Sequence, residues 1–364
     1  MATNKNQHFV PRCYLKAFTQ DGQNLAINLL NLDLERCIPL APVKSQCSGD
    51  YFYGQDAILE NAIQAVEQGY AKVVERIHLP GYRLTDGDRS LLRIFILFQH
   101  MRTEAASRRS VEIFDGMEHV VGQEVPDFKP SIKESVQMAM RTFAETMHIL
   151  DDLKVCIFRN KTGRPFITSD DPAVMTNRWH MEDARVRRKS PGIVSCGAVF
   201  FFPISPRMLC LAFDGDVYSV PHEAGWVDVR NVRDVEAINQ HQLLSAQANI
   251  YFREWEHRDW LLSCCRNISH MRLPSRHRIN YAVLDRVEGD HKVYRTVNSE
   301  EVGDHTEALI HSQSLLPKPA SWPSQLKWRS RGYVYTNGTG AGYVRAAHTA
   351  HRASTGFWKE PSKK

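Results

Sequence analysis

The chain has 364 residues, of which 43% are hydrophobic and 24% charged, and these values are typical of a globular protein with a buried core. No stretch approaches 18 consecutive apolar residues, and the polar start MATNKNQHFVPR lacks the apolar region of a secretory signal, so we expect a cytoplasmic protein without a membrane span. Eight cysteines without C-x-x-C spacing indicate reduced core thiols rather than a zinc site.

The net charge of +5 is unevenly placed. Residues 317–364 contain nine Lys or Arg and one acid, Glu360, so this segment carries +8 and the rest of the chain 5 − 8 = −3. Tryptophan and tyrosine are interleaved with these cations. A basic, aromatic tail on a mildly acidic body indicates nucleic acid as a partner, held by charge and by stacking.

The first half of the chain has mainly helical signals. Residues 25–32 and 37–40 are short apolar runs that predict a small hairpin. Residues 56–78 repeat apolar side chains at helical spacing. A second helix begins at Thr85, runs through the apolar LLRIFILF and ends in the basic stretch QHMRTEAASRR. A third begins at Ser131, where Glu134 completes a capping box.

The apolar period changes from 3.6 to 2 near Leu153. KVCIFR, NKTG and RPFITS predict a hairpin, and GAVFFFP and RMLCLAF predict two further strands. Helices are expected near 231–246 and in EWEHRDWLLSCC. The expected fold is therefore α+β, with an N-terminal segment and helical lobe (1–153), an antiparallel β-rich lobe with helices (154–285), and a polar region with a weakly ordered basic tail (286–364).

Five polar residues are candidates for a site. His8 is suited to proton transfer or metal binding, or it is a hydrogen-bonded structural residue. Gln99 and Arg102 end the apolar helix, and Arg102 needs an anionic partner, which is a phosphate, a carboxylate ligand or a glutamate of the preceding helix. Glu60 shares a helix face with Glu67, so the pair could hold a divalent metal, do acid–base work, remain solvated or pair with Arg102.

Asp170 lies in the segment Thr168-Ser-Asp-Asp-Pro172, after a predicted strand. A strand end that delivers acids into a turn is a common position for a catalytic or metal-binding carboxylate. Aspartate before proline is also an ordinary turn former, so a structural role stays open.

These stretches together resemble the bacterial family catalogued as domain of unknown function 4238, over residues 7–255. The matching motifs are His8-x-x-Pro11-x-x-x-Leu15-x-x-Phe18, Gln99-x-x-Arg102-Thr103 and Ile167-Thr-Ser-Asp170-x-Pro172. The family often has proline after Arg-Thr, where this chain has Glu104. The resemblance implies a soluble bacterial protein, often encoded in mobile or accessory regions, and it implies no activity.

Three functions are compatible with these patterns. The first is a phosphodiester-acting enzyme, a nuclease-like effector in defence against phage, in which His8, Glu60, Gln99, Arg102 and Asp170 converge between the lobes, with or without a divalent metal. The second is a non-catalytic binding or regulatory module whose motif residues are structural. The third is a small-molecule hydrolase or transferase. Convergence of the candidate side chains in one open cleft distinguishes the first from the second.

Overall fold

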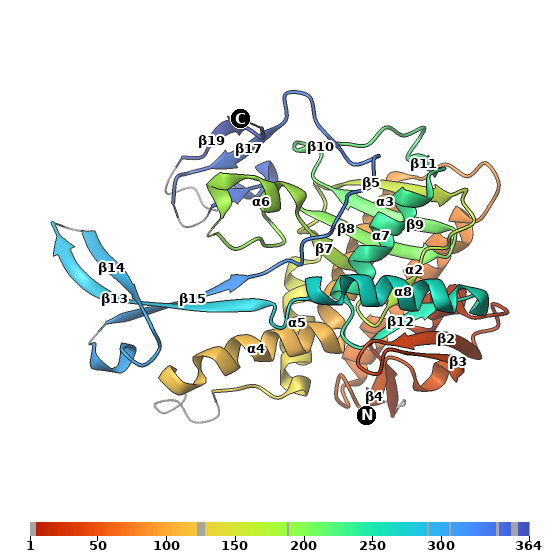
Figure 1. The fold of residues 1–364 in the computed structure, drawn as a ribbon, viewed down its shortest axis with the longest axis horizontal. Coiled ribbons are helices and arrows are strands. Elements are labelled where there is room, and N and C mark those ends of the chain that lie inside the picture. Colours follow the sequence, from red (N-terminus) through yellow and green to blue (C-terminus); the bar gives the residue numbers. More distant parts are fainter. Residues whose placement is uncertain are drawn as a thin grey trace.

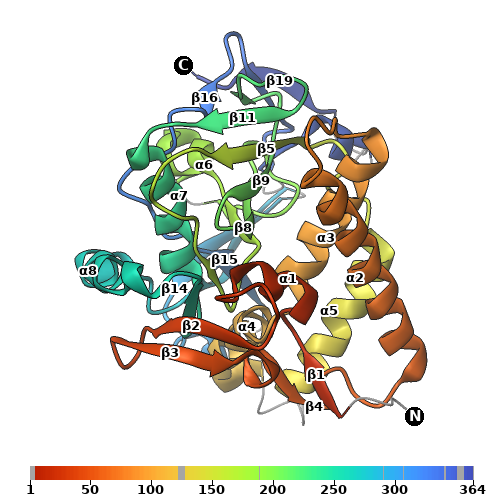
Figure 2. The ribbon, with the colours of Figure 1, turned by 90° about the vertical axis from the view of Figure 1, so that its right-hand side faces the viewer.

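The structure is a computed structural model that describes residues 5–121, 128–187, 189–289, 291–305, 307–339, 342–350 and 356–363. Helices and β-sheets are interleaved along the chain and pack against one another (Figures 1 and 2). The mixed α+β class is therefore confirmed, but the expected division into a helical lobe and a β lobe is wrong. One hydrophobic core joins Tyr70 and Phe95 of the helices to Phe202 of a strand, so neither part buries its apolar face alone.

The first half of the chain is mainly helical. Side chains at Asp56, Thr85 and Ser131 accept backbone N–H groups of the following turns, so the three predicted helix starts are confirmed. The basic stretch after the apolar helix does not end the helical region, because the backbone is extended only at Thr103, whose Oγ1 accepts the N–H of Ala106 and starts another helix. The helices are α1 (Arg12–Leu15), α2 (Ala57–Ile77), α3 (Asp86–Arg102), α4 (Glu104–Val121) and α5 (Ile132–Thr146).

A five-stranded sheet lies between the helices of the first half and helix α7 (Val232–Ser245), as Figure 2 shows. Its strands are, in spatial order, β11 (Trp226–Val229), β5 (Lys154–Asn160), β9 (Met208–Phe213), β8 (Val199–Ser205) and β7 (Val174–Thr176). Only the β11–β5 pair is parallel among these. Every residue of β8 is buried, because Phe200 and Phe202 pack toward the helical side and Phe201 packs on the side of α7.

A second sheet combines segments from three distant parts of the chain: β3 (Arg36–Pro42), β2 (Ala26–Asn31), β12 (Asn249–Phe252) and β6 (Thr168–Ser169), in that order. The expected hairpin over 154–169 is therefore wrong, since β5 pairs with β9 and β11 while β6 pairs with β12. Apolar side chains on both faces of β5 favour a position inside a covered sheet. Helix α8 (Arg258–Ile268) packs beside this sheet, and a short ribbon joins β1 (Asn6–His8) to β4 (Ser48–Asp50).

The C-terminal region is more structured than the sequence predicts. Strands β13 (His277–Glu288), β14 (His291–Val297) and β15 (Ala308–Ser314) form an arm that projects from the body (Figure 1). Beyond it, Val334 is buried in the core around the central sheet, and Arg345 is 2% exposed and pairs with Asp152 at 2.7 Å. The expectation of a weakly ordered tail is thus corrected for these residues, because they bury apolar and ionic side chains. The remaining elements are α6 (Arg178–Glu182), β10 (Tyr218–Ser219), β16 (Lys327–Trp328), β17 (Tyr333–Thr336), β18 (Tyr343–Val344) and β19 (Trp358–Pro361).

Within the part of the chain that the structure describes, no helix has both the length and the apolar character needed to cross a membrane. All eight cysteine thiols are unpaired. Short 3-10 turns connect several elements, at Lys16–Phe18, Val43–Ser45, Ala184–Val186, Trp255–His257, Ser269–Met271, Val302–Asp304 and Ala346–His348.

Candidate functional site

The last turn of α3 fixes the opening segment of the chain through Arg102. Its buried guanidinium donates to Tyr53 Oη, to Glu67 Oε1 and to the carbonyl of His8, each at 2.7 Å. Burial disfavours the charged guanidinium and lowers its pKa, but the interactions with Tyr53 and Glu67 have the larger combined effect. The pKa of Arg102 is therefore above its usual value. Of the partners that the sequence allowed, the glutamate of the preceding helix is the one observed.

Three of the five candidate residues meet beside this network. His8, Glu60 and Arg102 line a pocket of about 190 Å³. The Nδ1 of His8 lies 3.1 Å from the carbonyl of Gln46, and because a carbonyl only accepts, this nitrogen carries the proton. Burial lowers the pKa of His8, so the ring is neutral near pH 7. Gln99 does not line the pocket, because its amide is buried and donates to a backbone carbonyl of the opening segment at 2.8 Å.

Asp170 lies elsewhere, in a separate pocket of about 470 Å³. Its carboxylate accepts the backbone N–H groups of Gln247, Ala248 and Asn249 at 2.8, 2.7 and 2.9 Å. Burial raises the pKa of Asp170 to about 6, although these three bonds favour the charged form. Asp170 therefore holds the connection between α7 and β12, and it does not share a cleft with Arg102.

The rest of the Thr-Ser-Asp-Asp-Pro motif is also bonded to other segments. Thr168 Oγ1 lies 2.6 Å from Tyr14 Oη of α1, and Ser169 Oγ donates to Gln242 Oε1 of α7 at 2.8 Å. Asp171 is bonded to the helices of the first half. The motif thus joins the N-terminal segment, α7 and the helices around one short strand, which is a structural role.

The candidate acids do not form a shared metal site, because Glu60 and Asp170 line different pockets. Within the described ranges, no group of three or more His, Cys, Asp or Glu side chains is arranged to hold a metal ion.

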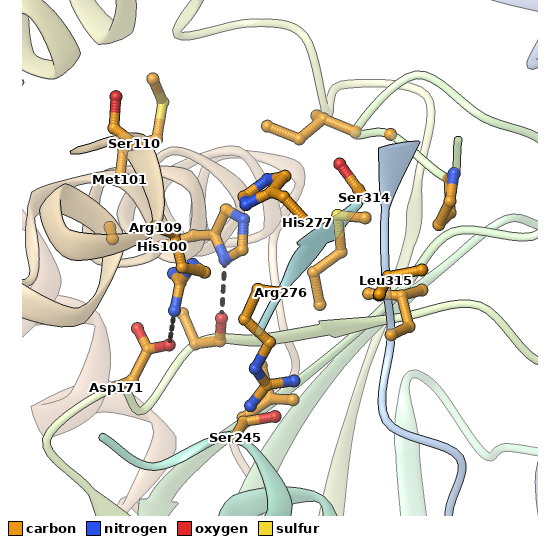
Figure 3. A pocket seen from close by; sticks show the side chains of 18 of the residues that line it. His100, Met101, Arg109, Ser110, Asp171, Ser245, Arg276, His277, Ser314 and Leu315 are labelled. Carbon is orange, nitrogen blue, oxygen red and sulfur yellow. Dashed lines mark hydrogen bonds and ion pairs between the residues drawn. The ribbon is translucent and has the colours of Figure 1, made fainter. Parts of the chain in front are cut away.

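A different pocket gathers ionisable groups that the motifs did not single out, and we name it the His–Arg pocket. It has a volume of about 450 Å³ and lies between α3, α4, β7 and the base of the arm (Figure 3). Its walls are largely apolar, including Met101, Ile113 and Leu315. The polar side chains that line it are His100, Arg109, Ser110, Asp171, Ser245, Arg276, His277 and Ser314.

The two arginines of the His–Arg pocket differ in their partners. Arg109 pairs with Asp171 at 2.5 Å (Figure 3). Asp171 also accepts the hydroxyl of Thr103 at 2.9 Å. Arg276 donates to the carbonyl of Leu244 at 2.6 Å, and no ion pair within 4.0 Å involves its guanidinium among the described residues. Burial, aided by Arg109, lowers the pKa of Arg276 to about 10, so it stays charged at neutral pH. The pocket therefore holds one cation without a bonded anion.

The two imidazoles of this pocket differ in the partners of their Nδ1 atoms. The Nδ1 of His100 lies 3.0 Å from the carbonyl of Ala173 and must donate to it, which leaves Nε2 with a lone pair. The Nδ1 of His277 is buried without a hydrogen-bond partner and lies 3.8 Å from Glu112, close enough for charge attraction but not for a hydrogen bond. Burial lowers the pKa of both rings, and Arg109 lowers it further, while Glu112 partly restores that of His277.

Sequence reasoning missed this arrangement because its members come from separate elements. His100 lies beside Gln99 at the end of the apolar helix, but a position next to a candidate site residue is no functional signal by itself. The basic run Ser275-Arg-His-Arg278 is the sequence signal for the opposite wall of the pocket. It becomes informative only in the folded chain, where the N–H of Arg276 donates to Glu112 of α4 and places the run beside that helix.

The chain belongs to the DUF4238 family of proteins of unknown function, whose model matches residues 6–256. This confirms the family that the sequence motifs predicted. No match was found among curated proteins, and none among solved structures. The match ends before Arg276 and His277, so the His–Arg pocket combines side chains of the family region with side chains beyond it.

Proposed function

We propose that this DUF4238 protein is an enzyme that cleaves a phosphate ester by acid–base catalysis in the His–Arg pocket. The observation that carries the proposal is the joint presence of two imidazoles and an unpaired guanidinium in one pocket. A guanidinium fork suits phosphate oxygens, and imidazoles transfer protons near neutral pH. A phosphate would also supply the anion that Arg276 lacks.

The geometry suggests a role for each group. His100, whose Nε2 has a lone pair, takes a proton from a water molecule as its oxygen bonds to phosphorus. His277 gives a proton to the ester oxygen as the P–O bond breaks, in the fraction of molecules in which its ring is protonated; burial disfavours this form and Glu112 partly restores it. Arg276 and Arg109 hold the phosphoryl oxygens and stabilise their charge in the transition state.

The volume of the His–Arg pocket and the side chains that line it limit the size and polarity of the substrate. A volume of about 450 Å³ accepts a small molecule or one nucleotide of a chain, and the apolar side chains Met101, Ile113 and Leu315 suit a weakly polar body attached to the phosphate. A phosphodiester therefore fits, and so does the ester of a small metabolite. Action against phage remains a prediction from the sequence.

A non-catalytic ligand-binding module is the second candidate. It is favoured by the inward bonding of Arg102 and Asp170, because the polar residues of the family motifs are engaged in holding the fold. In that case the His–Arg pocket binds a phosphate-bearing ligand without cleaving it.

The test compares wild type with His100→Gln, His277→Gln and Arg276→Gln, and uses His148→Gln, an exposed histidine outside the pocket, as the matched control. Hydrolysis of bis(4-nitrophenyl) phosphate, 4-nitrophenyl phosphate and a mixed DNA and RNA panel is measured together with the thermal shift caused by inorganic phosphate. Loss of either pocket histidine should lower kcat by ~10²–10⁴-fold. Loss of Arg276 should mainly raise KM and reduce the thermal shift.

The rate should also fall as the pH is lowered through the pKa of His100, which burial places below 6.5, because only the neutral ring accepts a proton. A thermal shift without turnover on any substrate would select the binding module. Full activity in both histidine variants, or the absence of both turnover and thermal shift, would refute this site.

A further inference from the structure

The C-terminal sheet carries a group of cations that have no bonded acid. Its neighbouring segments 327–333 and 359–363 are joined by the backbone N–H of Ser362, which donates to the carbonyl of Gly332, and by the pairing of β17 with β19. They lie at the end of the molecule that holds β16, β17 and β19 (Figures 1 and 2). We call this surface the C-terminal basic face, and its exposed cations are Lys327, Arg329, Arg331, Lys359 and Lys363.

No ion pair within 4.0 Å involves these five cations among the described residues, although the rest of the surface has many such pairs. The acids closest in the chain are already engaged. Glu360 pairs with Arg185 at 2.8 Å, and Asp216 is bonded to the hydroxyl of Tyr333. The positive charge of the face is therefore available to a partner that carries several negative charges.

Aromatic rings lie under two of these cations. Lys359 Nζ is 3.4 Å from the centre of the Tyr333 ring, and Lys363 Nζ is 4.7 Å from the centre of the Trp328 ring. Tyr335 lies opposite Lys359 on the neighbouring strand and is in contact with Tyr333, with ring centres 5.6 Å apart. A flexible lysine can leave the face of a ring and let a planar base stack there, while its charge moves to the adjoining phosphate.

We infer that the C-terminal basic face binds single-stranded nucleic acid. The phosphates contact its cations, and unpaired bases stack on Tyr333 and Tyr335. This goes beyond the proposed function, because it concerns another surface and does not depend on catalysis in the His–Arg pocket. Duplex nucleic acid offers the same phosphates but no free base faces, so the partly exposed rings favour the single strand.

The experiment measures fluorescence anisotropy of labelled 20-nucleotide single strands of DNA and RNA with the full-length protein, at 50 and 200 mM salt. One variant changes the five cations of the face to glutamine. The matched control changes five other exposed cations that form no ion pair among the described residues, namely Lys16, Lys72, Lys133, Arg141 and Lys161. Each variant is also made in the His100→Gln background, which separates binding from cleavage.

The face variant should bind at least tenfold more weakly at 50 mM salt, and the dependence of log K on log salt should flatten by up to about 3.5, at about 0.7 per lost phosphate contact. Tyr333→Leu should weaken single-strand binding by about fivefold or more and leave the salt dependence unchanged. Absence of binding by wild type at 50 mM salt, or an equal loss in the control variant, overturns the inference. So does duplex bound as tightly as single strand with no effect of Tyr333→Leu.

Discussion

Replacing Arg102 with methionine should destabilise the protein rather than merely inactivate it. The guanidinium is 1% exposed and donates three hydrogen bonds, while its partner Glu67 is 24% exposed. Methionine keeps most of the volume but leaves Tyr53, Glu67 and the carbonyl of His8 without their donor. Removing one partner of a buried ion pair costs ~3–5 kcal/mol, and partial hydration of Glu67 places the expected loss in the lower part of that range.

This loss in the free energy of unfolding can be converted into a change in melting temperature. With an unfolding entropy of ~2.1 cal/mol/K per residue, 364 residues give ~0.8 kcal/mol/K, so a loss in the lower part of the range corresponds to a Tm decrease of ~4–5 °C. The control is Arg108→Met, which breaks the exposed pair with Glu104 on α4. Such a pair contributes ~0.3–0.5 kcal/mol, so this control should shift Tm by less than ~1 °C.

Thermal melts of both variants by circular dichroism, with urea titrations for the free energy of unfolding, decide the question. In a double-mutant cycle, Glu67→Gln should cost clearly less in the Arg102→Met background than in wild type, because the two side chains act as a pair. An Arg102→Met protein that melts within ~1 °C of wild type would refute the structural role, and a folded but inactive variant would return Arg102 to the list of catalytic candidates.

Three further predictions follow from the structure. His241 is buried between Phe201 and Trp322, and burial lowers its pKa to about 3, so below the unfolded value of 6.5 the unfolded chain takes up a proton that the folded chain does not. The free energy of unfolding should therefore fall by up to ~1.4 kcal/mol per pH unit as the pH drops from about 6 to 4. His241→Phe should remove this part of the pH dependence in urea titrations. Deleting residues 317–364 exposes the apolar surface that Val334 covers and leaves Asp152 without its arginine, so the truncated protein should aggregate or melt at least ~5 °C lower; an unchanged Tm would mean that the tail is only an appendage. Alkylation of the denatured, unreduced protein should modify all eight cysteines, whereas six modified thiols would reveal a disulfide that the fold does not contain.

The features that the sequence predicts correctly depend on residues close together in the chain. The caps at Thr85 and Ser131 depend on residues three positions apart, and the alternation along Phe200–Phe202 depends on the pleat of one strand, so both are visible in the sequence. The ionic partner of Arg102 was among the alternatives because helix spacing placed Glu67 on a definite face of the preceding helix. The polar composition of residues 317–364, in contrast, predicts weak order, because it does not reveal that a few apolar and ionic side chains anchor the tail.

The sequence by itself determined the α+β class, the starts of the main helices, the family and the positive charge of the C-terminal region. Only the tertiary structure decided which polar side chains meet. It separated Asp170 from Arg102 by satisfying each one inside the fold, and it brought His100 of α3 to the same pocket as Arg276 and His277 at the base of the arm. The physical reason is that such a pocket is formed by contacts between elements distant in the chain, and no local propensity or spacing records which of them will pack together.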